Sequence, residues 1–251
     1  GVQTCALPIC EHQRLRLSPD GRRLLEHARR ILDLSDSTRA MMRNEESGGR
    51  LVVGALDVVL VAFMPCLIGR FRQRHRAIEL DIRSEASEAL VQQVSDGVLD
   101  LALSDGPVRS QTLESSLAFV DEMVLVTELD HPPITSPRDL RCAELYGFRH
   151  DCSFRFRMDH WLEEADCLQQ LPVLEIESYH TMLACVSAGM GAAWVLRSVL
   201  ATLPGNHQVR AHPLRDYGTT EIHFIWHSGH LTPNAQRLMA VHQDALVERR
   251  D

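Results

Sequence analysis

The apolar positions of the chain change their period near residue 50. Between Pro19 and Glu46 apolar residues recur every three or four positions, and the other face is rich in Arg, Glu and Asp. This pattern indicates one long amphipathic helix. Ser18 and Pro19 are typical of its start, because serine caps free N–H groups and proline suits the first helical turn. With the Ser-Gly-Gly that follows it, the pattern predicts a helix over 18–47.

A helix of this kind cannot bury its apolar stripe alone, and two partners are open for it. The helix either packs on its own domain or pairs with the same helix of a second subunit. We favour pairing, because the glycine pair after the helix is typical of a linker. The stripe predicted to form the dimer contact contains Leu24, Leu25, Ala28, Ile31, Leu32 and Ser35.

From residue 50 onward, short apolar runs alternate with amphipathic segments. The order β-α-β-α-β is typical of a parallel sheet covered by helices. A strand at 123–127 is followed by His131-Pro132-Pro133, which interrupts the pattern. The other elements expected in this part are strands at 50–56, 78–84 and 99–104 and helices at 59–75 and 86–96.

A second α/β unit follows the proline pair. Its first predicted helix, 152–165, has Phe156, Trp161 and Leu162 as its inner face. The further predicted elements are strands at 145–148, 172–176, 192–196, 209–213 and 221–226 and helices at 179–188 and 234–249. Two such units predict a bilobed α/β fold, with lobe I at 50–126 plus 227–251 and lobe II at 127–226.

Three predicted helix starts are candidate ligand sites. In open α/β sheets, ligands bind beyond the carboxyl ends of strands, where helices begin with free N–H groups. The three starts are 56–59, 151–155 and 177–181. Ser153 and Arg155 together suit a carboxylate, which an arginine binds through two parallel hydrogen bonds. The alternative is ordinary helix capping, and convergence of the three starts on one cleft would favour a ligand site.

Composition narrows the classes of protein. Of the 251 residues 45% are hydrophobic and 24% charged, as in ordinary globular proteins. The net charge is −8, which argues against a chain that binds nucleic acid over its whole surface. All 26 basic residues are arginine, which we interpret as the codon bias of a GC-rich genome. Apolar runs stay shorter than a membrane span, and residues 1–10 lack the features of a secretory signal. Seven cysteines without a CxxC motif favour free thiols, so we expect a cytoplasmic protein without membrane contact.

Metal and enzyme chemistry were weighed on two groups of residues. His223, His227 and His230 are close in sequence, but the first two lie about 13 Å apart along a strand, too far for joint ligation. Cys152 begins a helix, which can lower the pKa of a thiol, and His150 or His180 would be its base. Known catalytic motifs are missing around them. We therefore predict no metal, no cofactor and no enzyme, with a Cys152-dependent enzyme as an alternative.

Several motifs resemble those of LysR-type transcriptional regulators. Residues 16–32 (RLSPDGRRLLEHARRIL) resemble the passage from the wing to the linker helix, and 51–71 resemble the opening of the effector domain. Two later stretches, GVLDLA at 97–102 and YHTMLACVSAGMG at 179–191, continue the resemblance. The order and spacing of these motifs over 14–249 make it specific. Residues 151–162 and 178–180 resemble the branch often labelled glutamate-regulator-like.

The resemblance implies a linker helix followed by a type 2 periplasmic-binding-protein-like effector domain. A small, anionic effector would bind between the lobes, shift a dimer or tetramer and so control transcription. A stand-alone solute-binding protein is the alternative with the same two lobes. Val58 and Val59 stand where that branch often has hydroxyl residues, which leaves only backbone N–H groups at the first helix start. The implied effector site contains Leu56, Asp57, Val58, Val59, Ser104, Cys152, Ser153, Arg155, Ser178, Tyr179, His180 and Thr181.

The resemblance also implies an incomplete DNA-binding module. In the family, a winged helix-turn-helix before the linker helix binds promoter DNA. Residues 11–17 match only the end of the wing, where Arg14 and Arg16 would contact phosphates. Residues 1–9 match the translation of GGAGTTCAGACGTGTGCTCTTCCGATC, which resembles a sequencing-library adapter. We therefore expect 1–10 to be adapter-derived and without a fixed place in the fold, the natural protein to be longer, and this chain not to bind an operator specifically.

Overall fold

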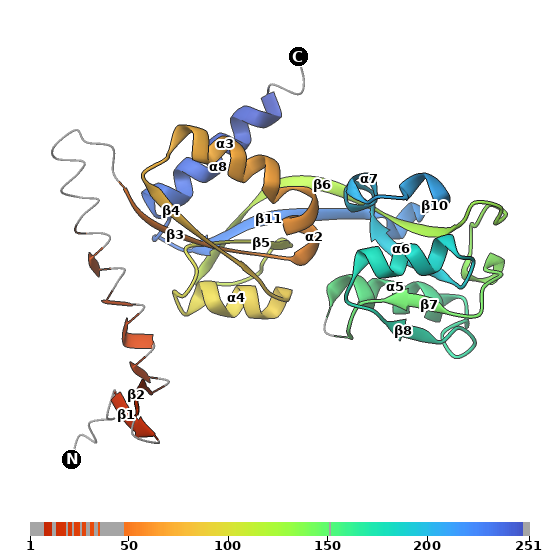
Figure 1. Ribbon diagram of the computed structural model, residues 1–251, viewed down its shortest axis with the longest axis horizontal. Coiled ribbons are helices and arrows are strands. Elements are labelled where there is room, and N and C mark those ends of the chain that lie inside the picture. Colours follow the sequence, from red (N-terminus) through yellow and green to blue (C-terminus); the bar gives the residue numbers. More distant parts are fainter. Residues whose placement is uncertain are drawn as a thin grey trace.

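The computed structural model describes residues 8–11, 14–18, 20–21, 23–25, 27–28, 31–32, 35, 48–150 and 152–247. Figure 1 shows two α/β lobes side by side, with the long strands β6 (Leu113–Glu128) and β11 (Thr219–His227) running between them. Among the described helices, none has the length and apolar character needed to cross a bilayer.

Lobe I is built on a mixed sheet with the order β4-β3-β5-β11-β6. Strand β3 lies parallel to both β4 and β5, whereas β11 is antiparallel to β5 and β6. Helices α3 and α8 cover one face and α4 covers the other (Figure 1). The further elements of lobe I are β3 (Gly49–Ala55), β4 (Ile78–Ser84), β5 (Leu101–Asp105), α2 (Asp57–Ala62), α3 (Met64–Arg74), α4 (Ser87–Ser95) and α8 (Pro233–Val247).

The single helix predicted over 59–75 is two helices in the structure. Phe63 ends α2 and begins α3, and Pro65 lies in the first turn of α3. Proline has no N–H to donate and clashes with the preceding turn, so it breaks a helix interior but suits a helix start. The break leaves α2 as a short helix whose start faces the neighbouring lobe.

Lobe II has the strand order β10-β6-β9-β7-β8, with β7 parallel to β8 and β9. In α5, Trp161 and Leu162 are buried as predicted, but Phe156 is 72% exposed, so its predicted inward position is wrong. Trp161 lies five positions after Phe156, and this offset places the two side chains on different sides of a helix. The elements are β7 (Leu145–Gly147), β8 (Val173–Glu175), β9 (Ala192–Leu196), β10 (Val209–Pro213), α5 (Ser153–Glu164), α6 (Tyr179–Ser187) and α7 (Arg197–Thr202).

The boundary between the lobes differs from the predicted one. Strand β11 pairs with β5 through Ile222–Ile225, so these residues, assigned above to lobe II, lie in the sheet of lobe I. Conversely, Met123–Val126 pair with β9 and lie in lobe II. An apolar run predicts a strand but not its partner, and β6 is long enough to serve both sheets.

Before the lobes, the described residues between 20 and 35 are helical, and they stand apart from both lobes in Figure 1. Ser18 caps this helix as predicted, because its Oγ accepts the Gly21 N–H at 3.0 Å. Strand β1 (Pro8–Glu11) pairs with β2 (Arg14–Leu17), so residues 8–10 of the segment expected to lack a fixed place form a hairpin strand. Residues 1–7, 12–13 and 36–47 lie outside the described residues, as do the side chains of Arg14 and Arg16.

Candidate functional site

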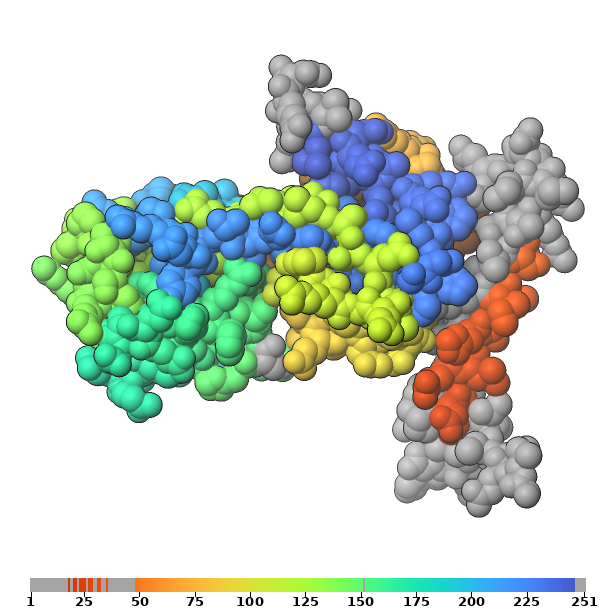
Figure 2. Space-filling model, turned by 180° about the vertical axis from the view of Figure 1, so that it is seen from behind, coloured from red at the N-terminus to blue at the C-terminus, as the bar shows by residue number. Residues whose placement is uncertain are grey.

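A cavity of about 300 Å³ lies where segments of the two lobes face each other. Lobe I contributes the start of α2 and the loop from β4 to α4. Lobe II contributes the segment after β7, the start of α5 and the segment before α6. Figure 2 shows from behind that the two lobes lie against each other. The lining residues are Leu56, Asp57, Val58, Ser84, Glu85, Ala86, Ser87, Phe148, Arg149, Cys152, Phe154, Glu177 and Tyr179.

Parallel strand pairing explains why these segments meet. In lobe I the last residues of β3 and β4, Ala55 and Ser84, are paired, and the Glu85 N–H donates to the Ala55 carbonyl at 3.3 Å. In lobe II, Gly147 of β7 pairs with Glu175 of β8. The carboxyl ends of parallel strands lie at one edge of a sheet, so each lobe presents two following segments together.

Five of the residues predicted at the site line the cavity. They come from both lobes: Leu56, Asp57, Val58, Cys152 and Tyr179. All three predicted helix starts therefore contribute lining residues, the third through Glu177 and Tyr179.

Arg155 does not reach the cavity. Its side chain is 5% exposed, its Nε donates to the Asp159 carboxylate at 2.8 Å, and its guanidinium donates to the Phe148 carbonyl at 3.0 Å. In this structure Arg155 is therefore engaged within lobe II rather than facing the cavity, and its binding of a ligand carboxylate stays a prediction. It lies on the buried face of α5, one turn before Asp159. Ser153 is not among the lining residues either, and its buried Oγ has no hydrogen-bond partner among the residues that the structure describes.

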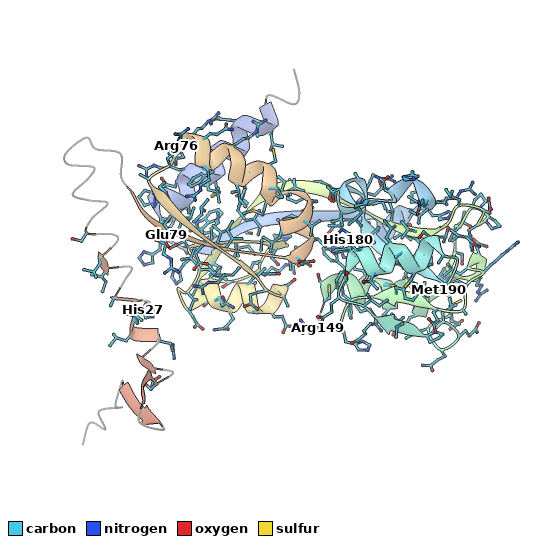
Figure 3. All side chains as sticks on the ribbon, in the orientation of Figure 1. His27, Arg76, Glu79, Arg149, His180 and Met190 are labelled. Carbon is cyan, nitrogen blue, oxygen red and sulfur yellow. The ribbon has the colours of Figure 1, made fainter. Side chains whose placement is uncertain are left out.

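The remaining predicted residues lie near the cavity but do not line it. Ser178 caps α6, with its Oγ accepting the Thr181 N–H at 3.3 Å, which is the capping alternative. His180 and Thr181 are exposed, and Figure 3 shows His180 on the side of lobe II that faces lobe I. Val59 is buried in the core, and buried Ser104 donates to the Asp105 carboxylate at 3.2 Å.

The structure adds lining residues that the sequence predictions missed. Most lie at or just after the end of a strand: Ser84 ends β4, Glu85–Ser87 follow it, and Phe148 and Arg149 follow β7. The rule applied to the first strand applies equally to these, so the signal was present. Ser87 is held by its hydroxyl, which donates to Asp105 at 2.6 Å.

Charge at the site is unevenly distributed. The Arg149 Nε lies 3.0 Å from a Glu177 carboxylate oxygen. Asp57 is exposed at the cavity, and its partial desolvation there raises the pKa of its carboxyl. Burial raises the pKa of the Tyr179 phenol well above its usual range, and negative charge at Cys152 and Asp57 adds to the effect.

The histidines considered for metal binding and for cysteine chemistry have other neighbours in the structure. Among the described residues, no group of three metal-ligating side chains comes together. His223 contacts the Glu221 carboxylate at 3.1 Å, while His227 and His230 are neighbours with ring centres 5.3 Å apart. His150, a candidate base for Cys152, lies 3.5 Å from Glu175, a carboxylate partner.

Comparison with known proteins decides the family. A family model described as LysR substrate binding domain matches residues 44–246. The chain belongs to the LysR family. It is 28% identical over 203 residues to the HTH-type transcriptional regulator GltR of Bacillus subtilis (strain 168), covering 80% of this chain and 68% of that protein. It is 26% identical over 224 residues to CzcR of the same strain, covering 88% and 75%.

Solved structures of LysR proteins confirm the fold. Full-length BenM superposes with a TM-score of 0.69 at 15% identity, covering 97% of this chain and 82% of that chain. CbnR, a LysR family transcriptional regulator, gives 0.63 at 20% identity, covering 92% and 82%. A structure of the BenM effector binding domain with its effector benzoate gives 0.68 at 15% identity, covering 80% and 93%. The predicted bilobed, type 2 periplasmic-binding-protein-like domain is thus confirmed. The named relatives are regulators of transcription rather than enzymes.

Proposed function

We propose that this chain is the sensing and self-associating part of a LysR-family transcriptional regulator. A small molecule binds in the cavity between the lobes and changes the arrangement of the subunits. In the full-length protein, that change alters how a DNA-binding module contacts promoter DNA. The observation that carries the proposal is a LysR substrate binding domain whose two lobes enclose a cavity at the carboxyl ends of their strands.

The geometry explains how a bound ligand could change the arrangement of the two lobes. Asp57 belongs to lobe I and Tyr179 to lobe II, yet both line one cavity. The lobes are joined mainly by the antiparallel strands β6 and β11, which run from one lobe to the other. A ligand that contacts both lobes stabilises the arrangement in which those contacts are made, and it shifts the population toward that arrangement.

The linker helix supports self-association. Leu24, Ile31 and Leu32 are 52%, 69% and 64% exposed, although they belong to one apolar stripe. Pairing with the same stripe of a second copy would remove this surface from water, and a tetramer would follow from further contacts. We place the protein in the cytoplasm, where a bacterial regulator meets promoter DNA.

A thermal-shift screen of amino acids, amines, dicarboxylates and aromatic acids tests the sensing role. We expect at least one compound to raise Tm in a saturable manner, because a ligand that binds the folded state stabilises it. Tyr179→Phe should weaken the binding of that compound. Thr181→Val, on the same helix but outside the cavity, should leave its binding unchanged. A hit that responds to neither substitution, or only to Thr181→Val, would place the site elsewhere.

A further inference from the structure

The cavity is lined by more negative than positive charge. Asp57, Glu85 and Glu177 carry carboxylates, and Arg149 carries the single guanidinium among its lining residues. Figure 3 shows Arg149 on the side of lobe II that faces lobe I. Behind this lining, the Asp105 carboxylate binds the Ser87 hydroxyl at 2.6 Å and adds negative charge on the side of lobe I.

The positive charges nearby are already engaged. Arg149 contacts Glu177 at 3.0 Å, so its charge is balanced within lobe II. Arg155 points into lobe II, where Asp159 and the Phe148 carbonyl hold it. A ligand carboxylate entering the cavity would therefore have to displace an internal partner of an arginine.

The helix starts of lobe I are also occupied. An anion binds at a helix start because free N–H groups and the helix dipole favour negative charge there. Asp57 is the first residue of α2, and Glu85 lies two residues before α4. Their carboxylates supply that negative charge, and neither has a described cationic partner. The lobe I side of the cavity thus repels an anion and attracts a cation.

Lobe II offers a matching acceptor. Tyr179 is 5% exposed and lines the cavity, and the structure gives its hydroxyl no hydrogen-bond partner among the described residues. Its ring lies against Phe148 with centres 4.8 Å apart, and Phe154 lines the cavity beside them. Aromatic faces attract ammonium and guanidinium groups, and a phenol oxygen accepts an N–H.

We propose that the effector of this chain carries a positively charged nitrogen, as an amine or a guanidine, which binds between Asp57 and Glu85 of lobe I and the Tyr179 hydroxyl of lobe II. The proposal rests on the proposed sensing function and specifies the ligand class of the same site. It reverses the sign of charge expected from Ser153 and Arg155. An apolar body on the ligand would pack against Leu56, Val58 and Phe154.

Calorimetric titration with matched pairs of probes tests the sign of charge. The pairs are benzylamine with benzoate, 1,4-diaminobutane with succinate, and L-arginine with L-glutamate, each up to low millimolar concentration. We expect at least one cationic probe to bind saturably. Its affinity should be higher than that of the anionic probe of the same pair. Affinity should fall as salt rises, because salt screens the attraction between charges.

Charge-neutral variants test the position. The double variant Asp57→Asn with Glu85→Gln should lower the affinity for the cationic probe at least tenfold, and Tyr179→Phe should lower it several-fold. Glu88→Gln is the matched control, since Glu88 is an exposed carboxylate in the first turn of α4 outside the lining. Circular dichroism and Tm of each variant separate lost binding from lost folding.

The outcomes separate this proposal from the sensing role. If an anionic probe binds saturably and Tyr179→Phe weakens it, the cavity is a sensing site but the proposed ligand class is wrong. If no cationic probe binds, or if the double variant binds as tightly as the original chain, the proposal is overturned. If neither probe class binds at the cavity and the broader thermal-shift screen yields no hit, the sensing role fails as well.

Discussion

The Arg155 guanidinium donates to the Asp159 carboxylate at 2.8 Å, across one turn of α5 inside lobe II. The pair is largely sheltered from water, and the same arginine holds the Phe148 carbonyl next to the cavity. Arg155→Met should destabilise the fold by about 3–5 kcal/mol, because it leaves Asp159 without its partner in a poorly solvated place. Urea unfolding followed by circular dichroism measures this loss.

An exposed pair provides the control for Arg155. Arg74 of α3 pairs with Asp244 of α8, and both side chains are about half exposed. Arg74→Met should cost less than about 1 kcal/mol, as exposed ion pairs generally do. If Arg155→Met lowered the free energy of unfolding as little as Arg74→Met, Arg155 would not be a structural residue.

Gly191 precedes β9 at a point of close approach. A Cβ there would lie 2.7 Å from the Glu144 carbonyl oxygen and 2.8 Å from the Tyr146 ring. The same carbonyl accepts the Ala192 N–H at 3.2 Å, which ties β9 to the start of β7. Gly191→Ala should therefore lower the free energy of unfolding by about 1–3 kcal/mol, since a backbone atom has little room to shift.

Gly69 of α3 is the comparison for Gly191. A Cβ at Gly69 meets no atom within 4 Å, and alanine favours a helix interior more than glycine does. Gly69→Ala should raise stability by about 0.5–1 kcal/mol in the same urea titration. Destabilisation by Gly69→Ala, or none by Gly191→Ala, would contradict the packing described for these two positions.

Helix and strand positions were predictable where the signal is local. Strands at 78–84, 192–196 and 209–213 have the predicted bounds, because each apolar pattern is complete within the segment. The first half of β6 was missed. Its exposed Leu117 and Val120 and its two serines do not form a strand pattern, and its partner β11 is about a hundred residues away in the chain.

The site was predictable in position but not in the direction of its side chains. Helix starts after strands indicated Asp57, Cys152 and Tyr179, which line the cavity, since strand order determines which edge of the sheet they occupy. Which arginine reaches the cavity depends on packing. Asp159 draws Arg155 inward, while Arg149, six residues earlier, lines the cavity. A sequence pattern does not contain that choice. The sequence therefore predicts an anionic ligand, whereas the lining residues in the structure lead us to propose a cationic one.

The stability of lobe II should depend on pH through His212. Its ring is buried, with Nε2 2.9 Å from the Thr127 hydroxyl and Nδ1 accepting the Ile134 N–H at 3.3 Å. Burial lowers the pKa of His212, and the neighbouring His131 and Arg210 contribute. The unfolded chain therefore binds this proton more readily, so stability is full above pH 6.5, the usual histidine pKa, and is lost as pH falls below it.

Unfolding titrations between pH 5 and 8 check the role of His212. One histidine can contribute at most about 1.4 kcal/mol per pH unit to the slope of the free energy of unfolding against pH. His212→Gln should remove the contribution of this ring below pH 6.5. His207→Gln, at an exposed histidine of the same lobe, should leave the slope unchanged. An unaltered slope in His212→Gln would show that this ring does not titrate with unfolding.

Self-association through the linker helix is the remaining expectation to test. Ile31 and Leu32 are among the most exposed apolar side chains of the described residues, and water contact with such a stripe is unfavourable. Size-exclusion chromatography with light scattering should give a dimer or larger species for this chain. Ile31→Asp with Leu32→Asp should shift the mass to the monomer, because charges cannot be buried in an apolar seam. Phe156→Asp, at an equally exposed position of lobe II, should retain the original mass. A monomer before substitution would rule out pairing by this stripe.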